Sequence, residues 1–335
     1  MLERCGREER PVIARRFKKM LRGLPDPISG PLVRRAFTLD RSKAEGFVFK
    51  IAQTREELEA AYRLVHDVYV EEGYSDRQET GTRVNLRYAL PTTTTFIGTH
   101  QGRVVITMTL IGDSPLGLPM DMIFSEELYA LRRQGRFFTE VGAFASHPDF
   151  RRRQQVLAMY LNKIMYMYAL HNLGSDDLVI AVNPKHEWVY RTLMLFEKIA
   201  GTKPYRYVKG APAIAMRLDL GTCHARWKRV FNGSPPEKNL DKFFTVDRPE
   251  AIRLPTAGEP FNVWDEAMFS YFFERKTDPR REDYGSLADL YRTLGLAAGE
   301  LGECPVRRAG PMRRPARSAE TTGVARSHCA AKVMG

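Results

Sequence analysis

A run of three arginines stands where the sequence predicts the start of a long helix. Arg151, Arg152 and Arg153 follow a strand predicted over 137–146 and precede a helix predicted over 156–173. The free N–H groups and the dipole of a helix N-terminus favour an anion. The run would therefore suit a phosphate group. The alternative is that an arginine-rich helix start only faces water.

A second set of polar side chains lies on and just after an earlier predicted helix. Arg63 could bind a carboxylate through paired hydrogen bonds, and His66, Glu72 and Tyr74 are close to it in sequence. A helix face that only contacts solvent explains the same pattern equally well.

Histidines and cysteines give no metal-binding pattern. His147 and His186 are isolated, and a zinc site needs at least a third protein ligand. There is no CxxC spacing, and the four cysteines are Cys5, Cys223, Cys304 and Cys329. We expect a reduced, cytoplasmic protein without disulfides, without a metal site and without a tightly bound cofactor.

The elements that must position these residues alternate between residues 47 and 220. Thr54 and Glu57 form a capping box at the start of a helix. The predicted order is a strand (47–51), a helix from 55, a hairpin (93–99 and 104–111), a short helix after 125, a strand (137–146), a helix (156–173), a strand (178–182), a helix after 184, and two strands (205–208 and 213–220). This order predicts an α/β (α+β) layered domain with a mixed central sheet.

Composition predicts four further segments around a domain at 46–220. We expect residues 1–45 to be a basic, partly disordered arm and residues 221–260 to be a linker. Residues 261–299 are expected to form a C-terminal helical extension packed on the core. Residues 300–335 have few large apolar side chains, so we expect a disordered basic tail.

The net charge of +12 belongs mainly to the two ends of the chain. Residues 1–45 hold 12 Lys and Arg against 6 Asp and Glu, and residues 300–335 hold 7 against 3. Such arms could contact an acidic partner or anionic lipid, but no nucleic-acid motif is present. The sequence also contains neither the roughly 20 apolar residues of a membrane span nor the pattern of a secretory signal.

The segment from Phe137 to Leu220 resembles the acyl-CoA-binding half of GNAT acyltransferases, with its strand, basic turn, helix, short strand, Asn-containing turn and further helix. The segment from Tyr62 to Tyr74 resembles one shared by acyl-homoserine-lactone synthases and FeeM-type N-acyl amino acid synthases. The stretch from Asn183 to Arg191 is similar to the FeeM-type branch. Together these matches cover residues 47–220. They imply a GNAT-like fold with helices on both faces of the sheet.

The resemblance implies an N-acyltransferase that moves a long-chain acyl group from acyl carrier protein, or from acyl-CoA, onto the amino group of an amino acid or similar amine. Two glycines of the usual phosphate loop correspond here to Gln154 and Val156, whose side chains would crowd a CoA pyrophosphate. The arginine run would instead suit the acidic surface or the single phosphate of an acyl carrier protein. Carrier protein and amine are therefore the expected partners.

The resemblance also implies roles for individual residues. Glu140 corresponds to a general base, unless it only pairs with an arginine such as Arg103 or Arg136. Tyr190 corresponds to the acid that protonates the leaving thiolate, unless it only packs. Donor binding would involve Val141, Gly142, Ala143, Phe144, Arg151, Arg152, Arg153 and Asn183. Acceptor binding would involve Arg63, His66, Glu72 and Tyr74.

Three other functions remain open at this point. A CoA-dependent N-acetyltransferase would bind acetyl-CoA saturably, and a GNAT-like protein without catalysis would not turn over. A basic nucleic-acid-binding protein would bind with a steep salt dependence. The sequence does not identify the acyl chain length, the acceptor amine or the oligomeric state.

Overall fold

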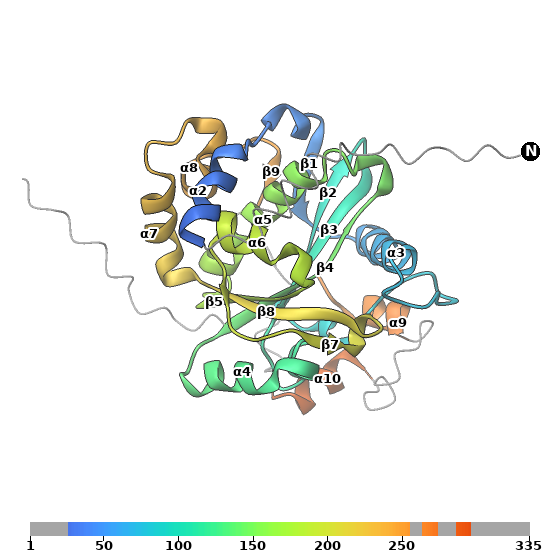
Figure 1. Ribbon diagram of the computed structural model, residues 1–335. Helices are drawn as coiled ribbons and strands as arrows, with labels where there is room; N and C mark the ends of the chain where they lie inside the picture. Colours follow the sequence, from blue (N-terminus) through green and yellow to red (C-terminus); the bar gives the residue numbers. More distant parts are fainter. Residues whose placement is uncertain (1–25, 255–262, 274–285, 296–335) are drawn as a thin grey trace, which may run out of the picture.

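The computed structural model describes residues 26–254, 263–273 and 286–295 (Figure 1). The strands are β1 (Phe47–Ile51), β2 (Thr93–His100), β3 (Arg103–Gly112), β4 (Phe138–Ser146), β5 (Asp177–Val182), β6 (Glu197–Lys198), β7 (Lys203–Tyr205), β8 (Ala211–Asp219) and β9 (Ile252–Arg253). The α-helices are α2 (Asp26–Ala36), α3 (Arg55–Glu71), α4 (Asp121–Arg133), α5 (Gln154–His171), α6 (Glu187–Val189), α7 (Leu220–Phe231), α8 (Leu240–Thr245), α9 (Glu266–Phe273) and α10 (Leu287–Thr293). Shorter turns are η1 (Arg41–Ala44), η2 (Leu86–Ala89), η3 (Pro148–Phe150), η4 (Pro184–His186), the π-helix η5 (Tyr190–Met194), η6 (Arg206–Val208) and η7 (Pro236–Lys238).

The strands form a mixed sheet in the order β6-β8-β5-β4-β3-β2-β1-β9, and β7 pairs with β8. The predicted hairpin is β2 and β3. It turns at Gln101 and Gly102, which both have positive φ (51° and 77°), as a tight hairpin turn requires. β4 and β5 are parallel, and so are β1 and β9.

Helices cover both faces of the sheet, as predicted (Figure 1). Helix α5 packs with α2, α7 and α8 on one face, and α3 packs with α4, α9 and α10 on the other. Strand β5 shows why two cores form. Leu178 and Ile180 contribute to the first core and Val179 to the second, because successive side chains of a strand point to opposite faces.

The parallel pair β4 and β5 opens into a fork. Their register runs from Phe138 opposite Asp177 only as far as Glu140 opposite Val179. Beyond that point β4 stays on β3 and β5 stays on β8. The backbones of residues 141–146 and 180–182 therefore diverge from each other.

An ion cluster holds the closed end of this fork. The Asp177 side chain is fully buried and accepts hydrogen bonds from Arg136 Nη2 at 2.8 Å and Arg217 Nε at 2.6 Å. Both arginines also donate to Asp219 Oδ2, at 3.1 and 3.0 Å. Because a buried carboxylate needs such partners, the cluster ties the two diverging strands together where they still pair.

A β-bulge lies on the arm of the fork that β4 forms. Thr107 pairs with Ala145 and Thr109 with Gly142, so two residues of β4 oppose Met108 alone. One of them, Ala143, has a φ of +49°, an unusual value for a residue with a Cβ. A bulge bends its strand and redirects side chains and amides, and here it turns residues 143 and 144 toward the fork.

We predicted a linker at 221–260. This prediction is wrong for residues 221–254, which the structure describes as folded. Helix α7 buries Trp227 and Phe231, helix α8 buries Phe243 and Phe244, and β9 extends the sheet beside β1. These residues belong to the core on the α5 face. Their apolar side chains lie in two short helices separated by a polar turn, a pattern too brief to stand out in the sequence.

The N-terminal arm differs from the expectation in a similar way. From residue 26 the expected arm is helical, and Val33, Phe37 and Leu39 are buried in the core. Residues 1–25 and the expected tail at 300–335 lie outside the described residues. Helices α9 and α10 of the expected extension pack on the α3 face through Trp264, Phe272, Tyr291 and neighbouring side chains. Over the described residues, no helix has the length and apolar character that crossing a bilayer would need.

Candidate active site

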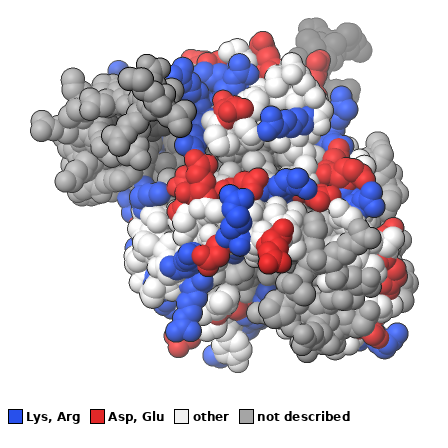
Figure 2. Space-filling view, turned by 90° about the vertical axis from the view of Figure 1, so that its right-hand side faces the viewer, with Lys and Arg blue, Asp and Glu red and all other residues white. Residues whose placement is uncertain are grey.

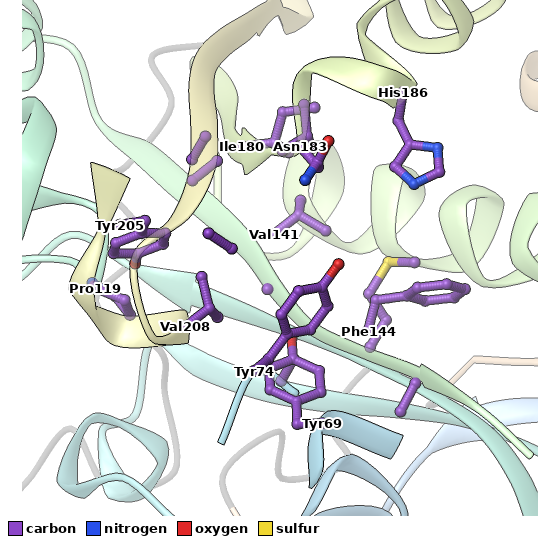
Figure 3. Close-up of a pocket in the computed structure, with 18 of the residues that line it drawn as sticks. Tyr69, Tyr74, Pro119, Val141, Phe144, Ile180, Asn183, His186, Tyr205 and Val208 are labelled. Carbon is purple, nitrogen blue, oxygen red and sulfur yellow. The ribbon is translucent and has the colours of Figure 1, made fainter. Parts of the chain in front are cut away.

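A pocket of about 450 Å³ occupies the fork between β4 and β5 (Figure 3). The backbone of residues 141–146 forms one wall, and residues 180–183 form another. Asn183 and His186 lie at one end of the close-up, and Tyr205 and Pro119 lie at the opposite end. The pocket therefore runs from the turn beside α5 to the segment after β7.

Glu140 lines this pocket at the point where the strands separate. Its side chain is buried, and the Met120 N–H donates to its Oε2 at 2.9 Å. Burial raises the pKa of the Glu140 carboxyl to about 8, because removal from water penalises the charged form. Neither Arg103 nor Arg136 provides its partner: Arg103 contacts His147, and Arg136 belongs to the Asp177 cluster.

The predicted donor-side residues on β4 and β5 also meet here. Val141, Gly142, Ala143, Phe144 and Asn183 all line the pocket. The Asn183 side chain accepts a hydrogen bond from the Lys185 N–H at 3.1 Å. This hydrogen bond caps the start of η4 at the rim of the pocket. The β4 bulge and the turn after β5 thus line a common space.

Tyr190 lines the pocket from the first residue of the π-helix η5. Its ring packs edge-on against Phe196 with centroids 5.7 Å apart, and burial raises its pKa. The phenol therefore keeps its proton at neutral pH. π-Helical turns occur often at functional sites, and this one sets the position of Tyr190 on the wall.

The arginine run separates into different environments. Arg151 lines the pocket and pairs with Glu71 at 2.7 Å and Glu72 at 3.9 Å. Arg152 is exposed, and the guanidinium of Arg153 lies 5.6 Å from the Phe47 ring centroid. Neither is among the residues that line the pocket. The three side chains diverge because the turn before α5 points them in different directions.

Two of the four residues predicted for acceptor binding lie elsewhere. Glu72 and Tyr74 line the pocket. Arg63 is exposed and pairs with Glu59 one turn earlier at 3.1 Å. His66 is buried beneath the loop that follows α3, where its Nε2 accepts from the Gln78 N–H at 3.0 Å. The structure does not bring Arg63 and His66 to the pocket, which α3 reaches through its last turn, at Val68 and Tyr69.

A group of tyrosines that the sequence did not indicate completes the wall opposite the donor side. Tyr69 on α3, Tyr88 on η2, and Tyr205 and Tyr207 around β7 all line the pocket. Behind them the Arg83 guanidinium lies 5.2 Å from the Tyr69 ring centroid and 4.5 Å from that of Tyr207. The spacing of Tyr205 and Tyr207 was the only sign of this wall in the sequence, and the same spacing is equally typical of a strand.

Comparisons with known proteins gave a match to a protein family and to solved structures. The family model described as N-acyl amino acid synthase FeeM matches residues 60–219. The structure of FeeM from uncultured soil microbes is 31% identical over 53% of this chain and 93% of that chain, with a TM-score of 0.48. A search of curated proteins gave no match.

Two other solved structures are more distant. The CoA-dependent acyl-homoserine lactone synthase BjaI is 17% identical and covers 63% of this chain and 94% of its own, with a TM-score of 0.45. A GNAT-family acetyltransferase from Streptococcus pneumoniae is 10% identical and covers 52% and 98%, with a TM-score of 0.37. With a GNAT-like fold, and with FeeM matched at 31% identity over nearly its whole length, the chain belongs to the FeeM N-acyl amino acid synthase family and is an N-acyltransferase.

Proposed function

We propose that this protein transfers a long-chain acyl group from the phosphopantetheine thioester of an acyl carrier protein to the amino group of an amino acid or similar amine. The product is an N-acyl amino acid. The observation that carries the proposal is the position of Glu140, a buried carboxyl at the point of a strand fork whose walls supply backbone amides. Membership of the FeeM family supports it.

The first step removes a proton from the acceptor. An α-amino group has a pKa near 8 and is mostly protonated at neutral pH. Glu140 has a pKa of about 8, so the proton passes between groups of similar basicity, as efficient general base catalysis requires. The freed lone pair then attacks the thioester carbonyl carbon and forms a tetrahedral intermediate.

The second step breaks the carbon–sulfur bond. The negative charge on the carbonyl oxygen is stabilised by backbone N–H groups of the β4 bulge, where Ala143 and Phe144 have no register partner on β3. As the intermediate collapses, the phosphopantetheine sulfur leaves and takes a proton from the Tyr190 phenol. The attacking nitrogen gives up its second proton, which returns to the Tyr190 phenolate through solvent, so that the amide forms and the phenol is restored. The proton on Glu140 is released to solvent before the next turnover.

The turn before α5 favours a carrier protein as the donor. Gln154 lines the pocket and Val156 is buried, so side chains stand where a CoA pyrophosphate would approach the helix start. Lys185 lines the pocket and is exposed, and Arg152, next to the pocket residue Arg151, is exposed as well. They would suit the acidic surface that presents a phosphopantetheine arm.

The acceptor would enter on the side of Glu72 and Tyr74. Both line the pocket with the tyrosines of α3, η2 and β7. In Figure 3 Tyr74 points toward the centre of the pocket from the α3 side. Arg63 and His66 have no part in this arrangement.

The test is product formation by the purified full chain. The chain is incubated with a C16 acyl carrier protein, C16 acyl-CoA or acetyl-CoA and a mixture of amino acids, and products are identified by mass spectrometry, with Glu140→Gln as the control. The proposal predicts N-acyl amino acids with the carrier protein as the better donor. Transfer from acetyl-CoA alone would identify a CoA-dependent N-acetyltransferase, and no transfer from any donor would contradict the proposal.

A further inference from the structure

Tyr205 presents a polar group that the protein leaves without a partner. It is the last residue of β7, its side chain is only 5% exposed, and it lines the pocket. Its hydroxyl has no hydrogen-bond partner among the described residues. A buried hydroxyl without a partner destabilises the folded state. A hydrogen bond from a bound ligand to this hydroxyl would offset that cost.

The position of the Tyr205 ring is fixed by its neighbours. It stacks on Tyr207 with centroids 5.7 Å apart and an interplanar angle of 26°. Pro119 lies beside it at the end of the pocket (Figure 3). The ring is therefore held in place at this end of the pocket before any ligand arrives, which lowers the entropy lost on binding.

Glu140 faces the same space. Its Oε2 accepts from the Met120 N–H, which leaves Oε1 for a ligand. Burial, together with the nearby Glu140 carboxylate, raises the pKa of Tyr205, so the phenol stays neutral. The other ionisable groups around it are Tyr69, Tyr207 and Arg87. Arg87 donates to the carbonyl oxygens of Leu116 and Gly117.

We propose that Tyr205 Oη accepts a hydrogen bond from the acceptor amine and holds its nitrogen beside Glu140 for attack on the thioester. An ammonium group has three hydrogens. One passes to Glu140, and a second donates to Tyr205, which fixes the direction of the lone pair that the proton transfer frees. This inference rests on the proposed acyl transfer to an amine and adds a specific contact to it.

The test compares Tyr205→Phe with the wild type in full-length protein, using an amino acid and its decarboxylated amine as alternative acceptors. We expect kcat/KM to fall roughly 10–100-fold for both acceptors, as for the loss of one well-placed hydrogen bond. The KM for the acyl donor and the pH midpoint of the rate should stay the same. Because the lost hydroxyl had no partner, the melting temperature should be unchanged or higher.

Tyr62→Phe is the matched control. Tyr62 is 1% exposed on α3 and is not among the residues that line the pocket, so the same loss of one oxygen should leave kcat/KM unchanged. Unchanged kcat/KM in Tyr205→Phe would overturn the inference while leaving the proposed function intact. A loss confined to the amino acid would also overturn it, because Tyr205 would then bind the carboxylate. A wild-type protein that acylates neither acceptor would overturn both proposals.

Discussion

At the scale of single residues, the buried carboxyl of Glu140 should make stability depend on pH. Its pKa is raised from 4.5 to about 8 in the folded protein. A group with a raised folded pKa contributes stability that is fully present below its unfolded pKa and is lost as pH rises through the folded pKa. The wild type should therefore lose stability between about pH 4.5 and pH 8 on account of Glu140.

Urea denaturation of the wild type and of Glu140→Gln at several pH values measures this effect. The difference in free energy of unfolding should shift in favour of the glutamine variant as pH rises, by up to about 4–5 kcal/mol, and then level off above pH 8. Because all other titrating groups are shared, they cancel in the difference. A difference that does not change with pH would show that Glu140 has an ordinary pKa.

Part of the pocket lining could be anticipated because the resemblance to GNAT acyltransferases names residues on successive elements of the chain. Residues 140–144, Asn183 and Tyr190 sit on consecutive elements whose pairing is typical of the fold, and the structure brings them to one pocket. The tyrosine wall could not be predicted in this way. Tyr69, Tyr88 and Tyr205 come from three distant segments, and no periodicity shows that these segments meet.

At the scale of elements, helix α2 supports the π-helix that carries Tyr190. Arg34 Nη1 donates to the Thr192 carbonyl oxygen at 3.2 Å. Val33 and Phe37 are buried in the same core as Leu193 and Met194. The segment from residue 26 is thus part of the folded domain, and removal of residues 1–45 should cost both stability and turnover.

Substitutions in and beside α2 test this role. Phe37→Ala should lower the free energy of unfolding by roughly 3–5 kcal/mol, as for a buried aromatic ring. Leu32→Ala is the matched control: Leu32 is 42% exposed on α2, and its loss should change stability by no more than about 0.5 kcal/mol. Chemical denaturation measures both. Equal, small effects in the two variants would mean that α2 does not stabilise the core.

At the scale of the whole molecule, alternation of strands and helices predicted the layered fold, and the hairpin and long helix lie within a few residues of their expected bounds. The short strands that pair at the edges of the sheet could not be predicted from the sequence. Strand β9 lies beside β1 although some 200 residues separate them, and two-residue strands carry no pattern of their own.

Acidic and basic side chains are mixed on the surface, as expected from a sequence whose net charge belongs mainly to its two ends. Figure 2 shows basic and acidic side chains interspersed over one face of the molecule. The excess of Lys and Arg belongs to residues 1–45 and 300–335, most of which lie outside the described residues.

The fold, the pocket and the reaction meet in Glu140, so the rate of acyl transfer by Glu140→Gln is the most direct measurement. The amide is nearly equal in size, and folding and donor binding should be preserved. Turnover at neutral pH should fall by roughly 10²–10⁴, the usual contribution of a positioned base. The deficit should shrink above pH 8, where the acceptor amine arrives already neutral. Full activity of the variant at neutral pH, or a loss equal at every pH, would contradict the role of Glu140 as the base.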